Sequence, residues 1–329
     1  YKTLEQGVFL NMFMIIIGFI ALVFGADILV KGSSNIAKKF YIPEVIIGLT
    51  IVCIGTSLPE LIITATSSMK GYTDLIIGNA IGSNLCNILL ILGFSSMLRP
   101  MIIDKDMKTV HIPISIIVTI LVLLLGNGII GYKEASINRI EGWALLIIFA
   151  VYFTFPIITT VKDIIKTEGN KKKANAHKEI SIITSIIYIL IGIIALKYGG
   201  DFVVDNAVII ANEVGISEKI TGLTIIAVGT ALPELITSII ATLKRETDLA
   251  IGNLIGSSIL NLCLILGLGA AITPIEFSLD FNFSFILSAI SLLLLWIFCN
   301  LGKGKNTISR FEGGILFSLY VVYIITLFI

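Results

Sequence analysis

Charged side chains are scarce in this chain of 329 residues, because Asp, Glu, Lys and Arg together make up only 14% of it. Soluble domains carry about a quarter charged residues, so the composition argues against a soluble domain. The net charge is +1, and the basic residues are scattered among loops, which gives no reason to expect a nucleic-acid partner. The lack of charge therefore excludes the usual soluble and nucleic-acid-binding classes.

Histidine and cysteine are also few, with two and four residues. Cys53, Cys86, Cys263 and Cys299 lie in apolar segments without metal-ligand spacing, so we expect reduced thiols that pack as small hydrophobic groups. The sequence has no nucleophile–base pair, phosphate-cradling loop or HExxH string. We therefore expect neither an enzyme nor a bound cofactor. No feature implies a protein partner, and we expect the chain to work as a monomer.

Hydrophobic residues, in contrast, make up 56% of the chain and recur in runs about as long as a membrane is thick. The first run holds Asp27 and lacks a small-residue cleavage pattern, so we interpret it as a span and not as a signal peptide. The pattern predicts an all-α polytopic membrane protein in a cell membrane. Its ten expected transmembrane helices are 11–37, 43–69, 75–98, 110–126, 138–161, 180–207, 216–243, 249–272, 281–299 and 310–328.

The ten expected helices form two sets of five. The longest polar stretch, 162–179, separates a first repeat at 1–161 from a second repeat at 180–329, and its composition suits a solvated cytoplasmic linker loop. Identical residues recur at a constant offset, which indicates an internal repeat. Seven pairs lie 174 positions apart: Gly25/Gly199, Asp27/Asp201, Gly48/Gly222, Thr50/Thr224, Glu60/Glu234, Asn79/Asn253 and Asn87/Asn261. Later, RIEG at Arg139–Gly142 echoes RFEG at Arg310–Gly313.

Five helices per repeat is an odd number, so the second repeat must enter the membrane from the opposite side. If the 162–179 loop is cytoplasmic, sixteen Lys and Arg residues lie in loops on that side and five on the other. The positive-inside rule then places both termini outside the cell. Two inverted-topology repeats are typical of secondary transporters, whose binding site lies between the repeats near the middle of the membrane.

The string IGTSLPEL at 54–61 recurs as VGTALPEL at 228–235, each copy inside an apolar run. A capping box in which Ser57 and Glu60 close a helix start is one interpretation of the first copy. The second copy disfavours it, because Ala231 stands at the cap position while Glu234 is kept. An ionised carboxylate at the centre of a membrane helix costs roughly 2.5–3.5 kcal/mol, so we expect a function for both.

Each copy also carries a proline, and Pro59 and Pro233 predict helix breaks that leave backbone carbonyls free. We expect the free carbonyls one turn upstream, at Cys53 and Ala227. Together with the hydroxyls of Thr56 and Thr230 and the two carboxylates, they form a set of hard oxygen ligands suited to a cation. The alternatives are protonated glutamates or pairing with a buried basic residue, of which only Lys31 and Lys197 lie within spans.

A second repeated string follows each copy, as GNAIGSNLCN at 78–87 and GNLIGSSILN at 252–261. Close helix packing alone accounts for its glycines. Its polar residues recur every four positions and so share one helix face. We favour ion coordination over interhelical hydrogen bonding for Ser83, Asn87, Ser257 and Asn261, and leave both open for Asn79 and Asn253. Asp27 and Asp201 are expected at interfaces or bonded to neighbouring helices, and Thr50 and Thr224 bonded to their own.

These paired strings resemble the cation/calcium exchanger superfamily, and most closely its sodium/calcium exchanger branch. The resemblance covers both halves and implies ten helices in two inverted repeats. It implies calcium binding by Glu60 and Glu234, shared with sodium and assisted by Thr56 and Thr230. It further implies flanking sodium sites formed by Ser57, Ser83 and Ser257 with the carbonyls of Cys53 and Ala227. The long helices 11–37 and 180–207 would slide across the rest during transport.

Two positions depart from the pattern of the family. Ala231 replaces the serine found in many relatives, which puts the number of sodium ions per cycle in doubt. Asn261 replaces the aspartate of potassium-dependent relatives, which disfavours potassium transport. The resemblance thus implies a secondary antiporter that exchanges sodium for calcium by alternating access. The alternatives are a proton/calcium antiporter and, less favoured because the repeat lies within one chain, a cation channel.

Overall fold

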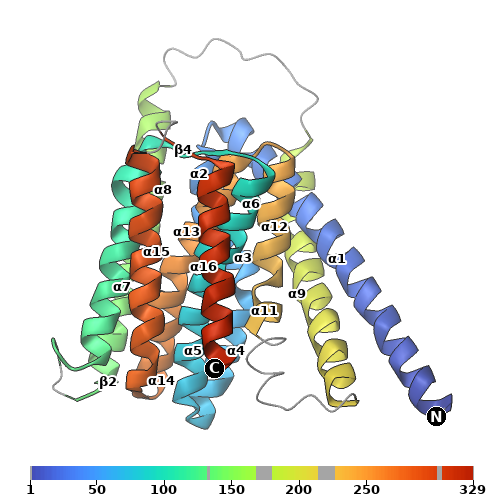
Figure 1. The fold of residues 1–329 in the computed structure, drawn as a ribbon. Helices are drawn as coiled ribbons and strands as arrows, with labels where there is room; N and C mark the ends of the chain where they lie inside the picture. Colours follow the sequence, from blue (N-terminus) through green and yellow to red (C-terminus); the bar gives the residue numbers. More distant parts are fainter. Residues whose placement is uncertain (1, 132–133, 168–179, 214–226, 302–305, 329) are drawn as a thin grey trace.

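The computed structural model describes residues 2–131, 134–167, 180–213, 227–301 and 306–328. Long apolar sequences make nearly all of them helical, and the helices stand side by side in a bundle (Figure 1). The elements of the first half are α1 (Lys2–Phe40), α2 (Glu44–Ile47), the π-helical η1 (Gly48–Val52), α3 (Cys53–Thr56), α4 (Leu58–Lys70), α5 (Thr73–Leu85), the π-helical η2 (Cys86–Ile91), α6 (Leu92–Leu98), β1 (Met101–Ile102), the π-helical η3 (Met107–His111), α7 (Ile112–Gly126), β2 (Ser136–Ile137) and α8 (Arg139–Thr167).

The described elements of the second half begin again with a long helix, and from α11 onward they follow an order similar to that of the first half from α3. Its elements are α9 (Ile182–Glu213), α11 (Ala227–Thr230), α12 (Leu232–Leu243), α13 (Thr247–Leu260), the π-helical η6 (Asn261–Ile265), α14 (Leu266–Ile272), β3 (Ile275–Glu276), the 3₁₀ turn η7 (Leu279–Phe281), α15 (Asn282–Leu301), β4 (Thr307–Ile308) and α16 (Arg310–Phe328). Two short antiparallel ladders join the halves, β1 with β4 and β2 with β3.

The described residues contain seven helices long and apolar enough to cross a membrane, and the bent pair Glu44–Thr56 and Leu58–Lys70 makes an eighth. The protein is therefore a helical polytopic membrane protein. Of the expected span 216–243, residues 216–226 lie outside the described part, and α11 and α12 occupy the rest. The expected span 310–328 is the 19-residue helix α16.

The linker prediction needs one correction. Helix α8 continues to Thr167, so residues 162–167 are helical and not loop. They carry Ile164 and Ile165 and have no glycine or proline, which lets the helix run past the apolar segment. Residues 168–179 of the expected loop lie outside the described residues.

Helices α1 and α9 are the two longest, with 39 and 32 residues, and they lie together at one side of the bundle (Figure 1). Glycines allow their backbones to touch. A Cβ on Gly18 would lie 2.8 Å from the carbonyl oxygen of Gly199, and a Cβ on Gly25 would lie 2.9 Å from that of Gly192. Small residues at such contacts are how helices associate in lipid, where apolar burial contributes little.

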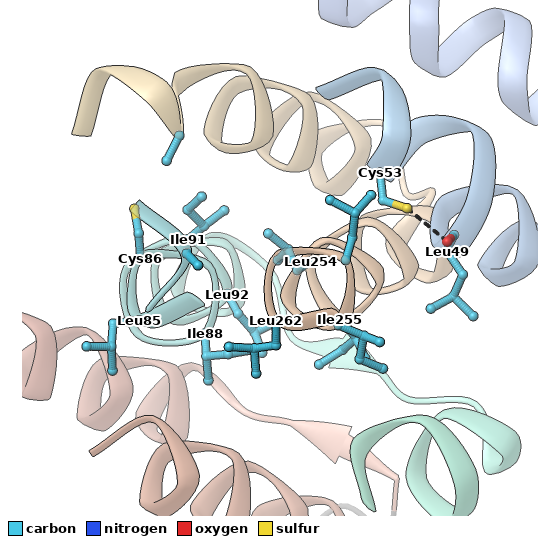
Figure 2. Close-up of a cluster of buried hydrophobic side chains, with 14 of the residues drawn as sticks. Leu49, Cys53, Leu85, Cys86, Ile88, Ile91, Leu92, Leu254, Ile255 and Leu262 are labelled. Atoms are coloured by element: carbon cyan, nitrogen blue, oxygen red, sulfur yellow. Dashed lines mark hydrogen bonds between the residues drawn. The ribbon is translucent and has the colours of Figure 1, made fainter. Parts of the chain in front are cut away.

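The core of the bundle forms where α5 and η2 pass α13 and η6. Figure 2 shows Ile88 beside Leu262, and the side chains of Leu85, Ile88, Leu92, Leu254 and Leu262 are all buried. The four cysteines are free thiols and buried in apolar surroundings, as the sequence predicts. Cys53 at the edge of this cluster donates its thiol hydrogen to the Leu49 carbonyl at 2.9 Å (Figure 2).

The repeated RIEG and RFEG strings begin α8 and α16, and the arginine and glutamate of each string are hydrogen-bonded within the protein. The Glu141 carboxylate accepts from the backbone N–H of Asn138 at 2.9 Å, and Glu312 accepts from that of Ser309 at 2.7 Å, which caps both helices. Arg139 donates to the Ile272 carbonyl at the end of α14.

The second copy makes the same contact in the other direction, because Arg310 donates to the Leu98 carbonyl at the end of α6. The glycine of each string allows close contact with the helix that the arginine of that string contacts. A Cβ on Gly313 would lie 2.7 Å from the carbonyl oxygen of Gly93 in α6. These strings therefore hold the two halves together and are structural.

A cluster of hydrogen bonds ties the end of α1 to α2 and α13. Glu246 accepts a hydrogen bond from Lys38 at 2.8 Å, and the single Ser34 hydroxyl lies 3.0 Å from Glu246 and 2.9 Å from Glu44. Partial burial alone would raise the pKa of Glu246, but hydrogen bonds with Glu44, Lys38 and Ser34 and the charge of Lys38 lower it below its ordinary value. Glu246 is thus a carboxylate whose charge the protein itself balances.

Candidate ion-binding site

The expected helix break is present in the first half. Helices α3 and α4 meet at Ser57 with a bend of 50°, where Pro59 lacks the N–H that would continue the helix. The capping interpretation of Ser57 is wrong, because its side chain makes no capping hydrogen bond to α4. The second half has the matching interruption at Ala231, between α11 and α12.

Ser57 instead crosses to the second half of the chain. Its hydroxyl donates to the Glu234 carboxylate with Oγ–Oε1 at 2.7 Å and lies 3.1 Å from the hydroxyl of Ser257. A serine has one hydroxyl proton, so when Ser57 donates to Glu234, Ser257 must donate to Ser57. One predicted site residue from each of α12 and α13 thus meets the break in the first half.

Glu60 and Glu234 occupy the first turns of α4 and α12 and are each only 1% exposed. The Ser83 hydroxyl faces the Glu60 carboxyl group, and the two glutamates lie near enough to repel each other. Within the described ranges, no basic side chain forms an ion pair with either of them. Lys31 pairs with Asp27 and Lys197 with Asp201, so both lysines expected within spans are engaged elsewhere.

Several oxygens of the site have no hydrogen-bond partner. They are Oε2 of Glu60, Oε2 of Glu234, Oδ1 of Asn87 and Oδ1 of Asn261. Buried polar atoms are normally paired, and leaving one unpaired costs roughly 1–3 kcal/mol. All four are acceptors on residues that the repeated strings carry, and no donor competes for them. Carboxylate and amide oxygens of this kind are chemically suited to a hard cation.

The predicted carbonyl ligands need a correction. The Cys53 carbonyl is not free, because it accepts the backbone N–H of Ser57 at 3.0 Å and the Thr56 hydroxyl at 3.4 Å. The helical ladder therefore continues to Ser57, and the carbonyl that loses its donor to Pro59 is that of Gly55. A carbonyl has a second lone pair, so Cys53 can still contribute one. Ala227, whose carbonyl was the other predicted ligand, is the first residue of α11.

Asn79 and Asn253 are hydrogen-bonded within the protein. Asn253 accepts from the Thr56 hydroxyl at 3.2 Å and lies 3.4 Å from the Ser238 hydroxyl. Asn79 lies 3.4 Å from the Thr64 hydroxyl and 3.3 Å from the Glu60 carbonyl. Sequence reasoning missed Thr64 and Ser238, although their spacing of 174 residues and their position one turn after each glutamate were a usable signal.

Asn84 is a further polar residue that sequence reasoning missed. It is buried, receives a hydrogen bond from Asn261 Nδ2 at 3.2 Å and donates to the Ser258 carbonyl at 3.1 Å. This contact orients the Asn261 amide so that its oxygen is left unpaired. Asn261 begins the π-helical η6 and Asn87 lies in the π-helical η2, and such turns are frequent at functional sites.

Close packing accounts for only part of the glycines in the second repeated string. A Cβ on Gly252 would lie 2.4 Å from the Val45 carbonyl, and one on Gly256 would lie 2.9 Å from the Leu49 Cα, so α13 touches α2 and η1 there. A Cβ on Gly78 would have only ordinary contacts, and one on Gly82 would meet nothing in the described part of the chain. Gly222, in the matching position to Gly48, lies outside the described residues, as does Thr224.

The expectations for Asp27 and Thr50 agree with the structure. Asp27 is bonded to a neighbouring helix, because Lys244 at the end of α12 lies 2.5 Å from its carboxylate. Thr50 bonds back to the Ile46 carbonyl of its own helical turn at 2.6 Å. His111 is paired with the Tyr152 hydroxyl at 2.8 Å, so it has a structural role.

The fold and this cluster define a helical polytopic membrane protein with a buried, acidic, oxygen-lined site. Its sequence matches the family described as "Sodium/calcium exchanger protein" over residues 10–158 and 184–329. The CaxA protein of Alkalimonas amylolytica is 35% identical over 320 residues, which cover 95% of this chain and 97% of that protein. Sodium/calcium exchanger MaX1 of Methanosarcina acetivorans is 32% identical over 353 residues, which cover 97% and 98%.

A solved structure of the sodium-calcium exchanger NCX_Mj, soaked with sodium and calcium, superimposes with a TM-score of 0.82 at 31% identity, and covers 97% of this chain and 98% of that chain. The chain therefore belongs to the sodium/calcium exchanger family. Antiport of calcium against another cation is the activity that this membership supports.

Proposed function

We propose that the chain exchanges sodium for calcium across the membrane by alternating access, with Glu60 and Glu234 as a site that the two ions share. The observation that carries the proposal is the pair of buried carboxylates with no basic partner among the described residues, together with the unpaired oxygens of two buried asparagines from the same repeated strings. Sodium is favoured over protons as the coupled ion because hydroxyl oxygens, which can ligate sodium, lie at the carboxylates, as that of Ser57 does at Glu234.

The donors fit a calcium ion. Calcium takes about six to eight oxygens, and the four unpaired oxygens of Glu60, Glu234, Asn87 and Asn261 supply the first of them. The further ligands in this proposal are the hydroxyls of Thr56, Thr230, Ser57, Ser83 and Ser257, the carbonyls of Cys53 and Ala227, and water.

Charge balance explains why such a site exchanges its ions. Two carboxylates carry a charge of −2, which either one calcium ion or two sodium ions neutralise. The empty site is costly to move past lipid because its charge is uncompensated. Since both ions need the same oxygens, sodium must leave before calcium binds, and the net transport follows the sodium gradient.

The proposed architecture has two inverted repeats, 1–161 and 180–329, with the linker in the cytoplasm and both termini outside the cell. The reciprocal contacts of Arg139 with Ile272 and of Arg310 with Leu98 support it. The two marked chain ends lie at the end of the bundle opposite the last residues of α8 and the first residues of α9, which agrees with this topology (Figure 1). In this proposal α1 and α9 slide as one unit, held together by their glycine contacts.

Uptake of radioactive calcium into proteoliposomes tests the proposal. Vesicles preloaded with sodium, potassium or acid are compared, and we expect uptake only against internal sodium. Uptake driven by internal acid would instead establish a proton/calcium antiporter, and uptake indifferent to the counter-ion would indicate a channel. Glu60→Gln should abolish uptake, whereas the matched variant Glu312→Gln, which removes a carboxylate from a helix cap, should retain it.

A further inference from the structure

A cavity of about 180 Å³ lies between α9 and the two helix breaks. Pro59, Thr230 and Pro233 line it on the side of the breaks, and three charged residues of α9 face them. Pro59 and Pro233 directly precede the two buried glutamates. The volume is enough for several water molecules, and Thr230, one of the proposed ligands, lies in its wall, so the cavity reaches the edge of the site. Figure 1 shows α9 beside α11 and α12, whose residues form its walls.

The charged residues of this wall are Lys197, Asp201 and Asp205. Lys197 donates to Asp201 with Nζ–Oδ2 at 2.7 Å, and its ammonium lies 4.7 Å from the centre of the Tyr198 ring. Asp205 forms no ion pair with any described residue. The wall therefore presents two carboxylates and one ammonium, a net charge of −1.

The lysine is particular to the second half of the chain. Residue 23, which lies 174 positions before Lys197, is Val23, and Asp27 pairs instead with Lys31 and Lys244. None of those three charged residues lines the cavity.

We propose, on the basis of the exchange function above, that this cavity is the approach of cations to the site and that Lys197 is a specificity-determining residue in it. By neutralising Asp201, Lys197 limits the attraction of the cavity for divalent cations. Each wall charge acts on calcium with twice the energy it has for sodium. Lys197 thus keeps calcium from outcompeting sodium at the entrance.

The test measures the initial rate of calcium uptake into proteoliposomes against external calcium, with and without external sodium as competitor. For Lys197→Met we expect the half-saturating calcium concentration to fall roughly fivefold, the size expected for one wall charge acting on a divalent ion. More external sodium should be needed to inhibit calcium uptake by this variant, while its maximal rate of calcium uptake stays unchanged. Asp205→Asn should shift the half-saturating calcium concentration in the opposite direction.

Lys31→Met is the matched control, because it removes the same charge from an i,i+4 pair with an aspartate outside the cavity. It should leave all parameters unchanged. The shift in Lys197→Met should also shrink when choline chloride raises the ionic strength, since screening acts on exposed charges. Lys197→Gln serves as a second variant if the first is poorly folded.

The inference is overturned if Lys197→Met behaves like Lys31→Met, or if its half-saturating calcium concentration rises. Its failure is distinguishable from failure of the exchange proposal. Each variant is compared with the wild type under whichever counter-ion, sodium or acid, drives wild-type uptake. A wild type driven by acid would refute sodium exchange and still show whether Lys197 tunes the approach of calcium.

Discussion

The two pairs of repeated strings in this chain differ in whether the carboxylate oxygens of their glutamates are hydrogen-bonded within the protein. In RIEG and RFEG, the carboxylates of Glu141 and Glu312 accept bonds from helix N-termini, and the arginines cap helices of the other half. In GTSLPE and GTALPE, Glu60 and Glu234 each keep a buried oxygen without a partner. The comparison teaches that repetition alone does not mark a site, and that the unpaired carboxylate oxygens distinguish the second pair of strings from the first.

The largest effect should come from removing the carboxylate of Glu60 or Glu234, each of which has an unpaired oxygen. Glu60→Gln and Glu234→Gln leave one charge where calcium needs two, so the apparent calcium affinity should fall by roughly a hundredfold or more. Equilibrium binding of radioactive calcium to purified protein measures this. Melting temperature should not fall, since no protein partner is lost. Normal calcium binding by Glu234→Gln would refute the shared site.

Removing a helix-capping carboxylate such as that of Glu312 should instead lower stability and leave calcium affinity unchanged. Glu312→Ala removes the acceptor of the Ser309 N–H and should destabilise the protein by about 1 kcal/mol, as loss of a helix cap does. The melting temperature should fall while the calcium affinity of the folded protein stays that of the wild type. A change in affinity as large as that of Glu60→Gln would show that the two kinds of string are not distinct.

The difference between Ser57 and Ala231 sharpens the comparison within the site. Ser57→Ala leaves Glu234 Oε1 without its donor and removes a proposed sodium ligand, so half-saturating sodium should rise about fivefold, equivalent to about 1 kcal/mol. Ala231→Ser adds the matching hydroxyl and should lower the half-saturating sodium concentration. Sodium-dependent calcium release from proteoliposomes measures both. Equal responses to the two substitutions would show that the hydroxyl is not a sodium ligand.

The smallest effect concerns Glu246. Its negative charge is balanced by Lys38, and the Ser34 hydroxyl lies within hydrogen-bond distance of its carboxylate. Its lowered pKa means that the folded protein favours the carboxylate. The resulting stabilisation is present above the ordinary glutamate pKa of 4.5 and is lost as the pH falls through the folded value, which lies below it. Glu246→Gln should therefore lower the melting temperature slightly at pH 7 and less below pH 4.5. A difference that grows on acidification would contradict this assignment.

Much of the fold follows from patterns of residues. Apolar runs predicted the membrane helices, and Pro59 and Pro233 predicted the interruptions before Glu60 and Glu234. The end of α8 could not be predicted, because polarity indicates where a helix leaves the membrane and not where it stops. The Cys53 carbonyl was wrongly expected to be free, since the pattern does not show that the N–H of Ser57 still reaches it.

The members of the site were predictable from spacing, but their partners were not. A spacing of four residues places Ser83 and Asn87 on one face, and it says nothing of the contact of Ser57 with Glu234, which joins residues 177 positions apart. Asn84 escaped notice because its match in the second half is Ser258, so it breaks the repeat. Its contact with Asn261 is set by packing of α5 against η6, which only the three-dimensional structure reveals.

The account depends most on the claim that calcium and sodium compete for the carboxylates of Glu60 and Glu234. The most direct measurement is equilibrium binding of radioactive calcium to the purified wild-type protein as sodium is raised at constant ionic strength. The account predicts that sodium raises the apparent dissociation constant of calcium without lowering the number of calcium ions bound at saturation. Calcium binding that is indifferent to sodium would contradict it.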